Sequence, residues 1–459
     1  MMNNNINWCN PTMSREWALL TPEQKREQRF NWWLNPEGVR FVSPEAEKAY
    51  KARVQRLIDV YKIQEPDRVP VSFHIGSIPA FLYGIDYHTA MYDCERAVQA
   101  WTEFNNEYAS KLDGFASLTS VIPARVYDLL DYKPYVWPGH GIPKSAAKVQ
   151  FNEGEYMKAD EYNALIRNPS DFWMRVYMPR IFGALESFRM CPPFTDIIEQ
   201  PIDNLMSLTK PEVQATLQTL LDVGEELSKW KKVTSEFNRR LLESGFPMGM
   251  SSMAKAPFDT LGDTLRGTQG IMMDMYRQPD KLLDAMDVIA DLTIDSAISR
   301  TNASRNVMVN FPLHKGADGW MSQKQFETFY WPSLKKVINA LINEGILVSL
   351  FAEGGYNTRL ESVNEFPKGA VHWRFDQTEM TRAKKILGDR CSIEGNVPAS
   401  MLVAGTSQEV KEYCRRLIEV CGKGGGYILS PGAVSLDNAK LDNLRAMVQT
   451  AEEYGVYKK

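Results

Sequence analysis

Short runs of β-forming apolar residues alternate along the chain with longer segments of helical periodicity. Eight such runs occur, at Val69–His74, Gly114–Thr119, Phe246–Ser251, Val307–His314, Ile346–Glu353, Ala370–Asp376, Cys391–Asn396 and Gly426–Pro431. Several are almost continuously apolar, as expected of strands that helices cover on both faces. Strands and helices alternating about eight times predict a parallel sheet of the α/β class. Eight strands favour a closed (β/α)8 barrel, the TIM barrel, over an open sheet.

Two segments between these runs have the sequence pattern of helices. Residues 322–343 carry apolar side chains at helical spacing, which predicts a helix between two strands. Ser407–Val420 predicts another, with Ser407 as the N-cap and glutamates in the first turn. The glycine-rich Cys421–Gly432 lacks the GK[ST] ending of a phosphate-binding loop and precedes a strand. It therefore predicts a tight turn into the last strand.

The first 65 residues predict a helical extension in front of the barrel domain, which spans residues 66–459. Thr21 and Ser43 each precede a proline, and each pair is typical of the start of a helix. Trp32 and Trp33 in the first helix need a cover, either the main domain or a partner. Residues from about 120 to 245 are too many for a simple connection and predict a large insertion after the second strand, over the C-terminal ends of the strands.

Composition narrows the class of protein. Of 459 residues, 44% are hydrophobic and 24% charged, which is ordinary for a globular protein. A net charge of −4 argues against nucleic-acid binding, and no apolar run is long enough to cross a membrane. The N-terminus has no secretory signal pattern. Six cysteines without a CxxC pair indicate free thiols, so we expect a cytoplasmic protein.

Chemistry in a barrel is expected at the C-terminal ends of the strands. His314 and Glu353 end consecutive predicted strands, which lie about 4.8 Å apart, so they could act on one ion or one substrate atom. Imidazole and carboxylate both bind zinc, and a catalytic zinc takes about three protein ligands. Asp376 on the next strand, or His74 across the barrel, would be the third. The plainer alternatives are a hydrogen-bonded core histidine and a glutamate that caps the following loop.

Other positions give weaker predictions. Asp86-Tyr87-His88 begins like a cobalamin-ligating D-x-H-x-x-G motif, but Met91 replaces the glycine, so we interpret it as the start of a helix. The methionine-rich segment around Met250 is typical of core packing and could also line an apolar pocket. The residues expected to bind substrate are His74, Met250, Phe351 and Asn396.

Three segments resemble the uroporphyrinogen decarboxylase superfamily. They are Asp67-Arg68-Val69-Pro70-Val71, the stretch from Phe258 to Pro279 with Leu261-Gly262-Asp263, and the C-terminal part from Lys385 to Met447 with Glu394-Gly395-Asn396-Val397-Pro398. The resemblance spans roughly residues 67–455 and implies a (β/α)8 barrel.

The superfamily's branches differ at positions that can be compared here. Its decarboxylases hold an acidic tetrapyrrole with an arginine-rich loop, but residues 72–77 of this chain contain no arginine. Its thiol methyltransferases hold zinc with a His-x-Cys pair and a later cysteine. This chain has Phe351 and Glu353 at the pair and Ala433 at the later position. Neither the tetrapyrrole nor a thiol is therefore the expected substrate.

What remains resembles the branch that moves a methyl group from a small methylated compound to the cobalt of a separate corrinoid protein. An aromatic methyl ether is the methyl donor we expect. Zinc on His314 and Glu353 would be a Lewis acid suited to oxygen, and the corrinoid would arrive on its partner protein. The insertion or the extension would dock that partner or a second copy in a homodimer. The alternatives are a metal-free decarboxylase or lyase of the same fold, and a non-catalytic subunit of a methyl-transfer complex.

Overall fold

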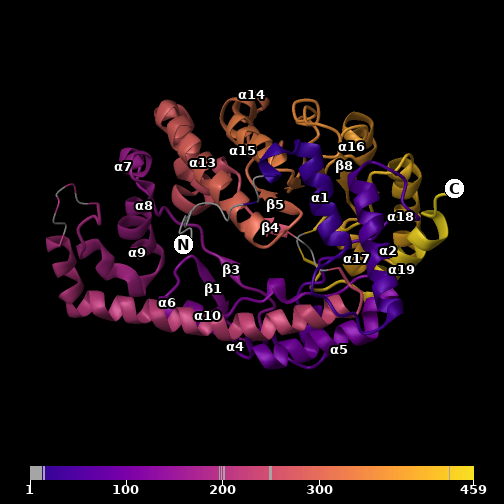
Figure 1. The fold of residues 1–459 in the computed structure, drawn as a ribbon, viewed down its shortest axis with the longest axis horizontal. Helices are drawn as coiled ribbons and strands as arrows, with labels where there is room; N and C mark the ends of the chain where they lie inside the picture. Colours follow the sequence, from indigo (N-terminus) through magenta and orange to yellow (C-terminus); the bar gives the residue numbers. More distant parts are fainter. Residues whose placement is uncertain are drawn as a thin grey trace.

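A parallel sheet with helices around it forms the C-terminal half of the protein (Figure 1). The computed structural model describes residues 13, 16–195, 197, 199, 202–247, 251–433 and 435–458. The sheet has the order β4-β5-β6-β7-β8-β9, and all its neighbouring strands are parallel. The strands are β4 (Ser251–Met253), β5 (Met308–Leu313), β6 (Leu347–Ala352), β7 (Val371–Phe375), β8 (Ser392–Glu394) and β9 (Tyr427–Ile428).

The register of the central strands places their C-terminal ends side by side. Leu313 of β5 pairs with Ala352 of β6, and Ala352 pairs with Phe375 of β7. The residue that follows each of these three strands therefore starts at the same edge of the sheet. Along β5 the side chains alternate between buried and partly exposed, because one face packs on helices and the other does not.

The predicted strands are found in the C-terminal part of the chain. β5, β6, β7 and β8 lie within their predicted runs, and β9 is shorter than its run. β4 begins at Ser251, the last residue of its run. Val69–His74 forms no regular strand in the described chain, but Val71 makes a parallel bridge with Leu429 beside β9.

The predicted strand Gly114–Thr119 is wrong. This segment is irregular and then enters a 3-10 turn, Leu118–Ser120. The Asn105 amide hydrogen-bonds both the N–H and the C=O of Ala116, and the Trp101 indole donates to the C=O of Ser117. Side chains of α5 (Cys94–Leu112) thus take the backbone groups that a neighbouring strand would have used. Within the described residues, strand pairing does not close the sheet into a ring.

Helices cover the sheet between its strands. They are α11 (Pro257–Asp259), α12 (Gly267–Arg277), α13 (Pro279–Ala303), α14 (Gln323–Gln325), α15 (Trp331–Asn343), α16 (Met380–Leu387), α17 (Ala399–Ala404), α18 (Ser407–Leu417) and α19 (Leu441–Tyr454). The predicted helix 322–343 is confirmed as α14, a π-helical turn and α15. The N-cap of α18 is Thr406 and not Ser407, because Thr406 and Glu409 form a reciprocal capping box. The glycine-rich turn before β9 is confirmed, with Gly424, Gly425 and Gly426 at positive φ.

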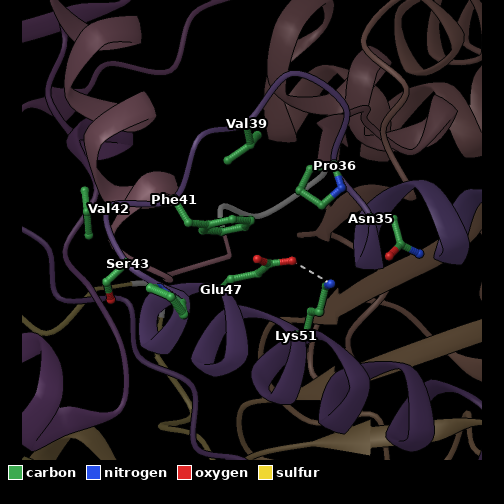
Figure 2. Close-up of a pocket in the computed structure, with 9 residues that line it drawn as sticks. Asn35, Pro36, Val39, Phe41, Val42, Ser43, Glu47 and Lys51 are labelled. Atoms are coloured by element: carbon green, nitrogen blue, oxygen red, sulfur yellow. Dashed lines mark hydrogen bonds and ion pairs between the residues drawn. The ribbon is translucent and has the colours of Figure 1, made fainter.

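The N-terminal extension packs against the N-terminal ends of the strands. Its helices α1 (Pro22–Leu34) and α2 (Pro44–Tyr61) begin after Thr21 and Ser43, whose side chains cap them as predicted. Phe30, Trp33 and Tyr50 are buried in one cluster with Val307, Leu347 and Ile428 of the main domain. The main domain thus provides the cover for Trp33, while Trp32 stacks on Trp17. The loop between the two helices borders a hollow of about 550 Å³, where Glu47 pairs with Lys51 (Figure 2).

The segment between α5 and β4 contains mostly helices. Before it come α3 (Ile78–Leu82), α4 (Tyr87–Tyr92) and α5, and Asp86 caps α4. The segment itself holds α6 (Ala124–Leu130), a small sheet of β1 (Tyr135–Pro138), β2 (Gly141–Ile142) and β3 (Gln150–Phe151), then α7 (Tyr162–Arg167), α8 (Pro169–Phe172), α9 (Met178–Ile181) and α10 (Pro211–Glu243). The long helix α10 runs along one side of the molecule (Figure 1). No helix in the described part of the chain combines the length and apolarity that a membrane crossing requires.

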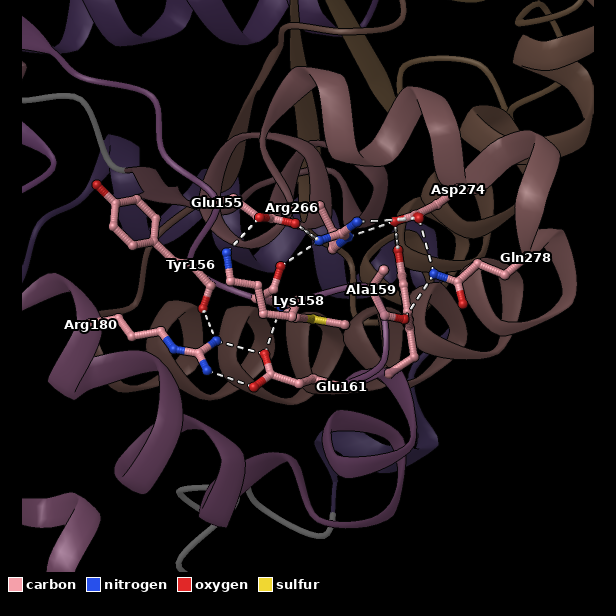
Figure 3. A network of polar contacts seen from close by, with 11 residues as sticks. Glu155, Tyr156, Lys158, Ala159, Glu161, Arg180, Arg266, Asp274 and Gln278 are labelled. Carbon is pink, nitrogen blue, oxygen red and sulfur yellow. Dashed lines mark hydrogen bonds and ion pairs between the residues drawn. The ribbon is translucent and has the colours of Figure 1, made fainter.

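A buried polar network fastens this segment to the main domain (Figure 3). The Arg266 guanidinium donates to Asp274 at 2.6 Å and to the Met157 carbonyl at 2.5 Å. Tyr162 donates to the same Asp274 carboxylate at 2.7 Å. The network holds residues 155–162 against α12, directly after the turn that carries Asp263.

Candidate functional site

His314 and Glu353 meet at the C-terminal edge of the sheet. Each follows a paired strand end, and His314 Nε2 lies 3.6 Å from Glu353 Oε1, as their predicted places on neighbouring strands suggest. The two side chains are 36% and 32% exposed, so a ligand can reach both. Burial raises the pKa of the Glu353 carboxyl, while the nearby imidazole opposes that shift.

Asp263 holds the other ring nitrogen of His314. It lies in the π-helical turn Thr260–Leu265, and its Oδ2 is 2.5 Å from His314 Nδ1. This hydrogen bond raises the pKa of His314, against the effect of burial. The imidazole is thus oriented by one carboxylate and presents Nε2 towards a second. Sequence reasoning gave Asp263 no role, although it stands in the Leu261-Gly262-Asp263 motif.

Asp259 fixes the backbone at the end of β5. Its carboxylate accepts hydrogen bonds from the N–H groups of His314 and Lys315, both at 3.0 Å, and from the Tyr330 hydroxyl at 2.7 Å. It is fully buried, and burial raises its pKa. Asp259 therefore sets where His314 leaves the strand. No pattern in the sequence had indicated this role for Asp259.

Two lysines surround Asp263. Lys255 Nζ lies 2.8 Å from Asp263 Oδ2, and Lys315 Nζ lies 2.9 Å from Oδ1. Burial alone would raise the pKa of Asp263, but the His314 hydrogen bond and the two ammonium groups hold it well below its usual range. Asp263 is therefore ionised, and three basic side chains share its one negative charge.

Asp376 directly follows β7, at the same edge of the sheet as His314 and Glu353, but its carboxylate contacts the backbone. Its Oδ2 accepts a hydrogen bond from the Gly354 N–H at 3.0 Å. Its charge helps raise the pKa of Glu353, after burial and Asp259. The described residues contain no group of three or more His, Cys, Asp or Glu side chains arranged to hold a metal ion. His314 Nε2 and Glu353 thus face each other without a third such side chain among the described residues.

His74 and Phe351, two residues expected to bind substrate, both contact Arg374. The Arg374 guanidinium lies 2.7 Å from His74 Nε2 and stacks over the Phe351 ring at 4.2 Å. Its Nε lies 3.8 Å from Glu394. Desolvation and the Arg374 cation lower the pKa of His74 to about 4, so His74 is neutral and accepts the hydrogen bond. Nothing in the strand pattern identified Arg374, which lies within the predicted run of β7.

Asn396 and Met250 are the other two residues expected to bind substrate. Asn396 is buried, and its amide donates to the carbonyls of Asp376 and Thr378, both at 2.8 Å. It thus ties the loops after β7 and β8 together. Met250 lies outside the described residues.

A cavity of about 690 Å³ opens beside the edge strand β4 and reaches His314. It lies between the end of β4, helix α13 and the insertion. Its walls are formed by Pro169, Ser170, Trp173, Met253, Ala254, Lys255, Thr260, Ile289, Leu292, Thr293, Ser296, Ala297, Arg300, Pro312 and His314. A small molecule bound there would lie within reach of an imidazole whose raised pKa favours its protonated form.

Comparison with known proteins gives one family. The family model described as Uroporphyrinogen decarboxylase (URO-D) matches residues 201–454. Similar curated proteins include the uroporphyrinogen decarboxylases of Azoarcus sp. (strain BH72) and Saccharophagus degradans. The first is 23% identical over 259 residues, 54% of this chain and 67% of that protein. The second is 26% identical over 239 residues, 51% of this chain and 64% of that protein. The matches thus span about two thirds of these relatives.

Among solved structures, a methyltransferase from Methanosarcina mazei has a similar fold. The TM-score is 0.54 at 15% sequence identity, and the match covers 87% of this chain and 98% of the other. At this identity the likeness concerns the fold. It extends beyond the part of the chain that the family model matches.

Proposed function

This chain belongs to the uroporphyrinogen decarboxylase family, and from that premise we propose that it is a methyltransferase. It takes a methyl group from a small methylated compound, an aromatic methyl ether, and delivers it to the cobalt of a separate corrinoid protein. The observation that carries the proposal is His314, held between Asp263 and Glu353 at the end of a cavity. The fold shared with a methyltransferase supports it.

An aromatic methyl ether resists demethylation because phenolate is a poor leaving group. A proton delivered to the ether oxygen lowers that barrier, typically by a factor of about 10²–10⁴ in rate. His314 is the donor: the methyl C–O bond breaks, its electron pair stays on the oxygen, and the Nε2 proton joins that oxygen. The methyl group leaves without those electrons. The electron pair that accepts it would come from the corrinoid of the partner protein.

Glu353 and Asp263 have different tasks in this proposal. Asp263 orients the ring through Nδ1 and stabilises its protonated form. Glu353, next to Nε2, attracts the proton on that nitrogen, and after the phenol departs with that proton it favours the uptake of a new one from solvent. Lys255 and Lys315 keep Asp263 ionised, so the imidazole retains its partner throughout.

Zinc also fits part of this site. A histidine whose second nitrogen bonds a carboxylate is the usual arrangement of a zinc ligand, and Asp263 provides that carboxylate. His314 Nε2, then without its proton, and Glu353 would hold the ion, which would replace the proton donor as a Lewis acid for the ether oxygen.

The proposal is tested by anaerobic incubation with a reduced corrinoid protein and a panel of methyl ethers and methylamines. Loss of the cobalt(I) absorbance reports methyl transfer. We expect wild-type protein to react with an ether, and His314→Gln and Glu353→Gln each to lower the rate by about 10²-fold or more.

The control is His140→Gln, since His140 stacks on Trp137 in the small sheet of the insertion. Its rate should equal that of the wild type. Full rates in the His314 and Glu353 variants would remove both residues from the mechanism. Release of CO₂ from a carboxylated substrate without methyl transfer would favour the decarboxylase alternative, and a stable corrinoid-protein complex without reaction would favour a non-catalytic subunit.

A further inference from the structure

A chain of hydrogen bonds leads from the insertion to the histidine of the site. The Lys315 ammonium lies 2.9 Å from Asp263 Oδ1, the carboxylate oxygen that does not contact His314. Lys315 Nζ also donates to the Thr268 hydroxyl at 2.7 Å, and that hydroxyl donates to Glu153 Oε1 at 2.6 Å. Thr268 lies in α12, whereas Glu153 belongs to the insertion and follows β3. The chain of contacts therefore joins the insertion to the main domain.

The chemistry of the groups fixes the direction of this chain. An ammonium group has three N–H donors and no acceptor, whereas a carboxylate only accepts. The Thr268 hydroxyl must therefore accept from Lys315 and donate to Glu153, and it cannot reverse these roles. Glu153 also accepts from the Thr268 backbone N–H at 3.0 Å, and its carboxylate lies 3.7 Å from the Lys315 ammonium. The hydroxyl thus has one orientation, with its lone pairs towards the ammonium.

Two glycines on either side of Asp263 leave the space that this chain needs. A Cβ on Gly262 would lie 2.6 Å from Cε of Lys315, so a larger residue would displace the lysine. A Cβ on Gly267 would lie 3.3 Å from the carbonyl oxygen of Gly154 in the insertion, and Gly267 has a φ of +70°. The turn that carries Asp263 therefore accommodates the lysine at one glycine and the insertion at the other.

We propose that Thr268 is a positioning residue for His314. Its hydroxyl, oriented by Glu153, holds the Lys315 ammonium against Oδ1 of Asp263. With that oxygen occupied, the carboxylate presents Oδ2 to Nδ1 of the imidazole, and Nε2 stays directed into the site. The proposal rests on the proposed function, since it names what holds the proton donor of that reaction in place. It also gives the insertion a part in that reaction, through Glu153.

The kinetics of cobalt(I) loss with the full chain test this role. Thr268→Val keeps the outline of the side chain and removes the hydroxyl, whereas Thr268→Ser keeps the hydroxyl. The Lys315 side chain is only 8% exposed, so water replaces the lost acceptor poorly. We expect Thr268→Val to lower kcat about tenfold with the KM for the methyl donor unchanged, and Thr268→Ser to retain the wild-type kcat. Glu153→Met should also lower kcat, and the double variant should lose no more than the slower single variant, because both changes break one chain.

The matched control is Glu155→Met. Glu155 lies in the same segment of the insertion, but its described contacts are with Arg266 and Lys158, outside this chain of contacts. Its kcat should equal that of the wild type. An unchanged kcat in Thr268→Val, an equal loss in Thr268→Ser, or equal losses in Glu153→Met and Glu155→Met would each overturn the proposal.

A second readout does not depend on methyl transfer. A ring N–H that donates to a carboxylate gives a proton resonance far downfield, and in protein with isotope-labelled histidine its absence from His314→Gln identifies the signal of His314. We expect Thr268→Val to move this resonance upfield and Thr268→Ser to leave it in place. If none of the methyl compounds reacts, the proposed function fails, and this comparison still decides the role of Thr268. The absence of such a resonance from the wild type, or a resonance that stays in place in Thr268→Val, would overturn that role.

Discussion

At the scale of single residues, the hydrogen bond that His314 donates to Asp263 shifts the pH range over which His314 carries its proton. The bond raises the pKa of the imidazole, so the protonated form persists to higher pH than in a free histidine. If that form donates to the ether oxygen, activity is present below the raised pKa and is lost as pH rises through it. The alkaline limb of the pH–rate profile thus reports the Asp263–His314 pair.

Asp263→Asn should move that limb to lower pH and lower the rate at neutral pH. The reason is that an amide does not stabilise the imidazolium as a carboxylate does. The measurement is the rate of cobalt(I) loss against pH in the wild type and the variant, with circular dichroism to show that both are folded. An alkaline limb that stays in place would show that another group titrates there.

The two central residues of the site could be predicted from the sequence, and their supports could not. His314 and Glu353 directly follow apolar runs, and parallel strands with level ends bring such residues together. Asp263 and Asp259 belong to a helical turn some fifty positions earlier, where a carboxylate looks like any surface residue. Lys255 reaches the site because β4 is short and its end faces the cavity, which no periodicity reveals.

At the scale of elements, side chains of α5 replace strand pairing at residues 116–117. Asn105 makes two hydrogen bonds with the backbone of Ala116, at 2.9 and 2.8 Å, and all the groups are buried. A strand pattern describes apolar and polar positions, but it does not show which partner satisfies the backbone. That is why Gly114–Thr119 was predicted as a strand while β5 to β8, whose neighbours are strands, were predicted correctly.

Asn105→Ala should destabilise the protein by about 1–3 kcal/mol, because it leaves a buried N–H and a buried C=O without partners. The midpoint of urea unfolding, followed by tryptophan fluorescence, measures the change. Asn106→Ala is the matched control on the same helix, where the side chain is exposed. Equal midpoints for the two variants would mean that water replaces the amide at Ala116.

At the scale of the whole molecule, the two ends of the sheet have separate tasks. The C-terminal ends carry His314, Glu353 and the cavity, whereas the N-terminal ends are covered by α1 and α2. Arg29 of α1 connects the extension to this lower end. It is fully buried and donates to the Asn306 carbonyl, the Asn302 amide oxygen and the Glu344 carbonyl. Burial lowers its pKa to about 10, so it stays charged at neutral pH.

Arg29→Met should therefore lower the stability of the protein without changing the reaction at the candidate site. Three acceptors would lose a charged donor, and we expect a loss of about 3 kcal/mol or more in the free energy of unfolding. The rate of cobalt(I) loss should stay that of the wild type, because the contacts of Arg29, at the end of α13 and before β5 and β6, lie at the N-terminal ends of the strands, opposite His314 and Glu353. Arg40→Met, an exposed arginine between α1 and α2, is the control for stability. If Arg29→Met changed the rate of cobalt(I) loss while the protein stayed folded, the extension would be coupled to the site, and the separation of the two ends would be wrong.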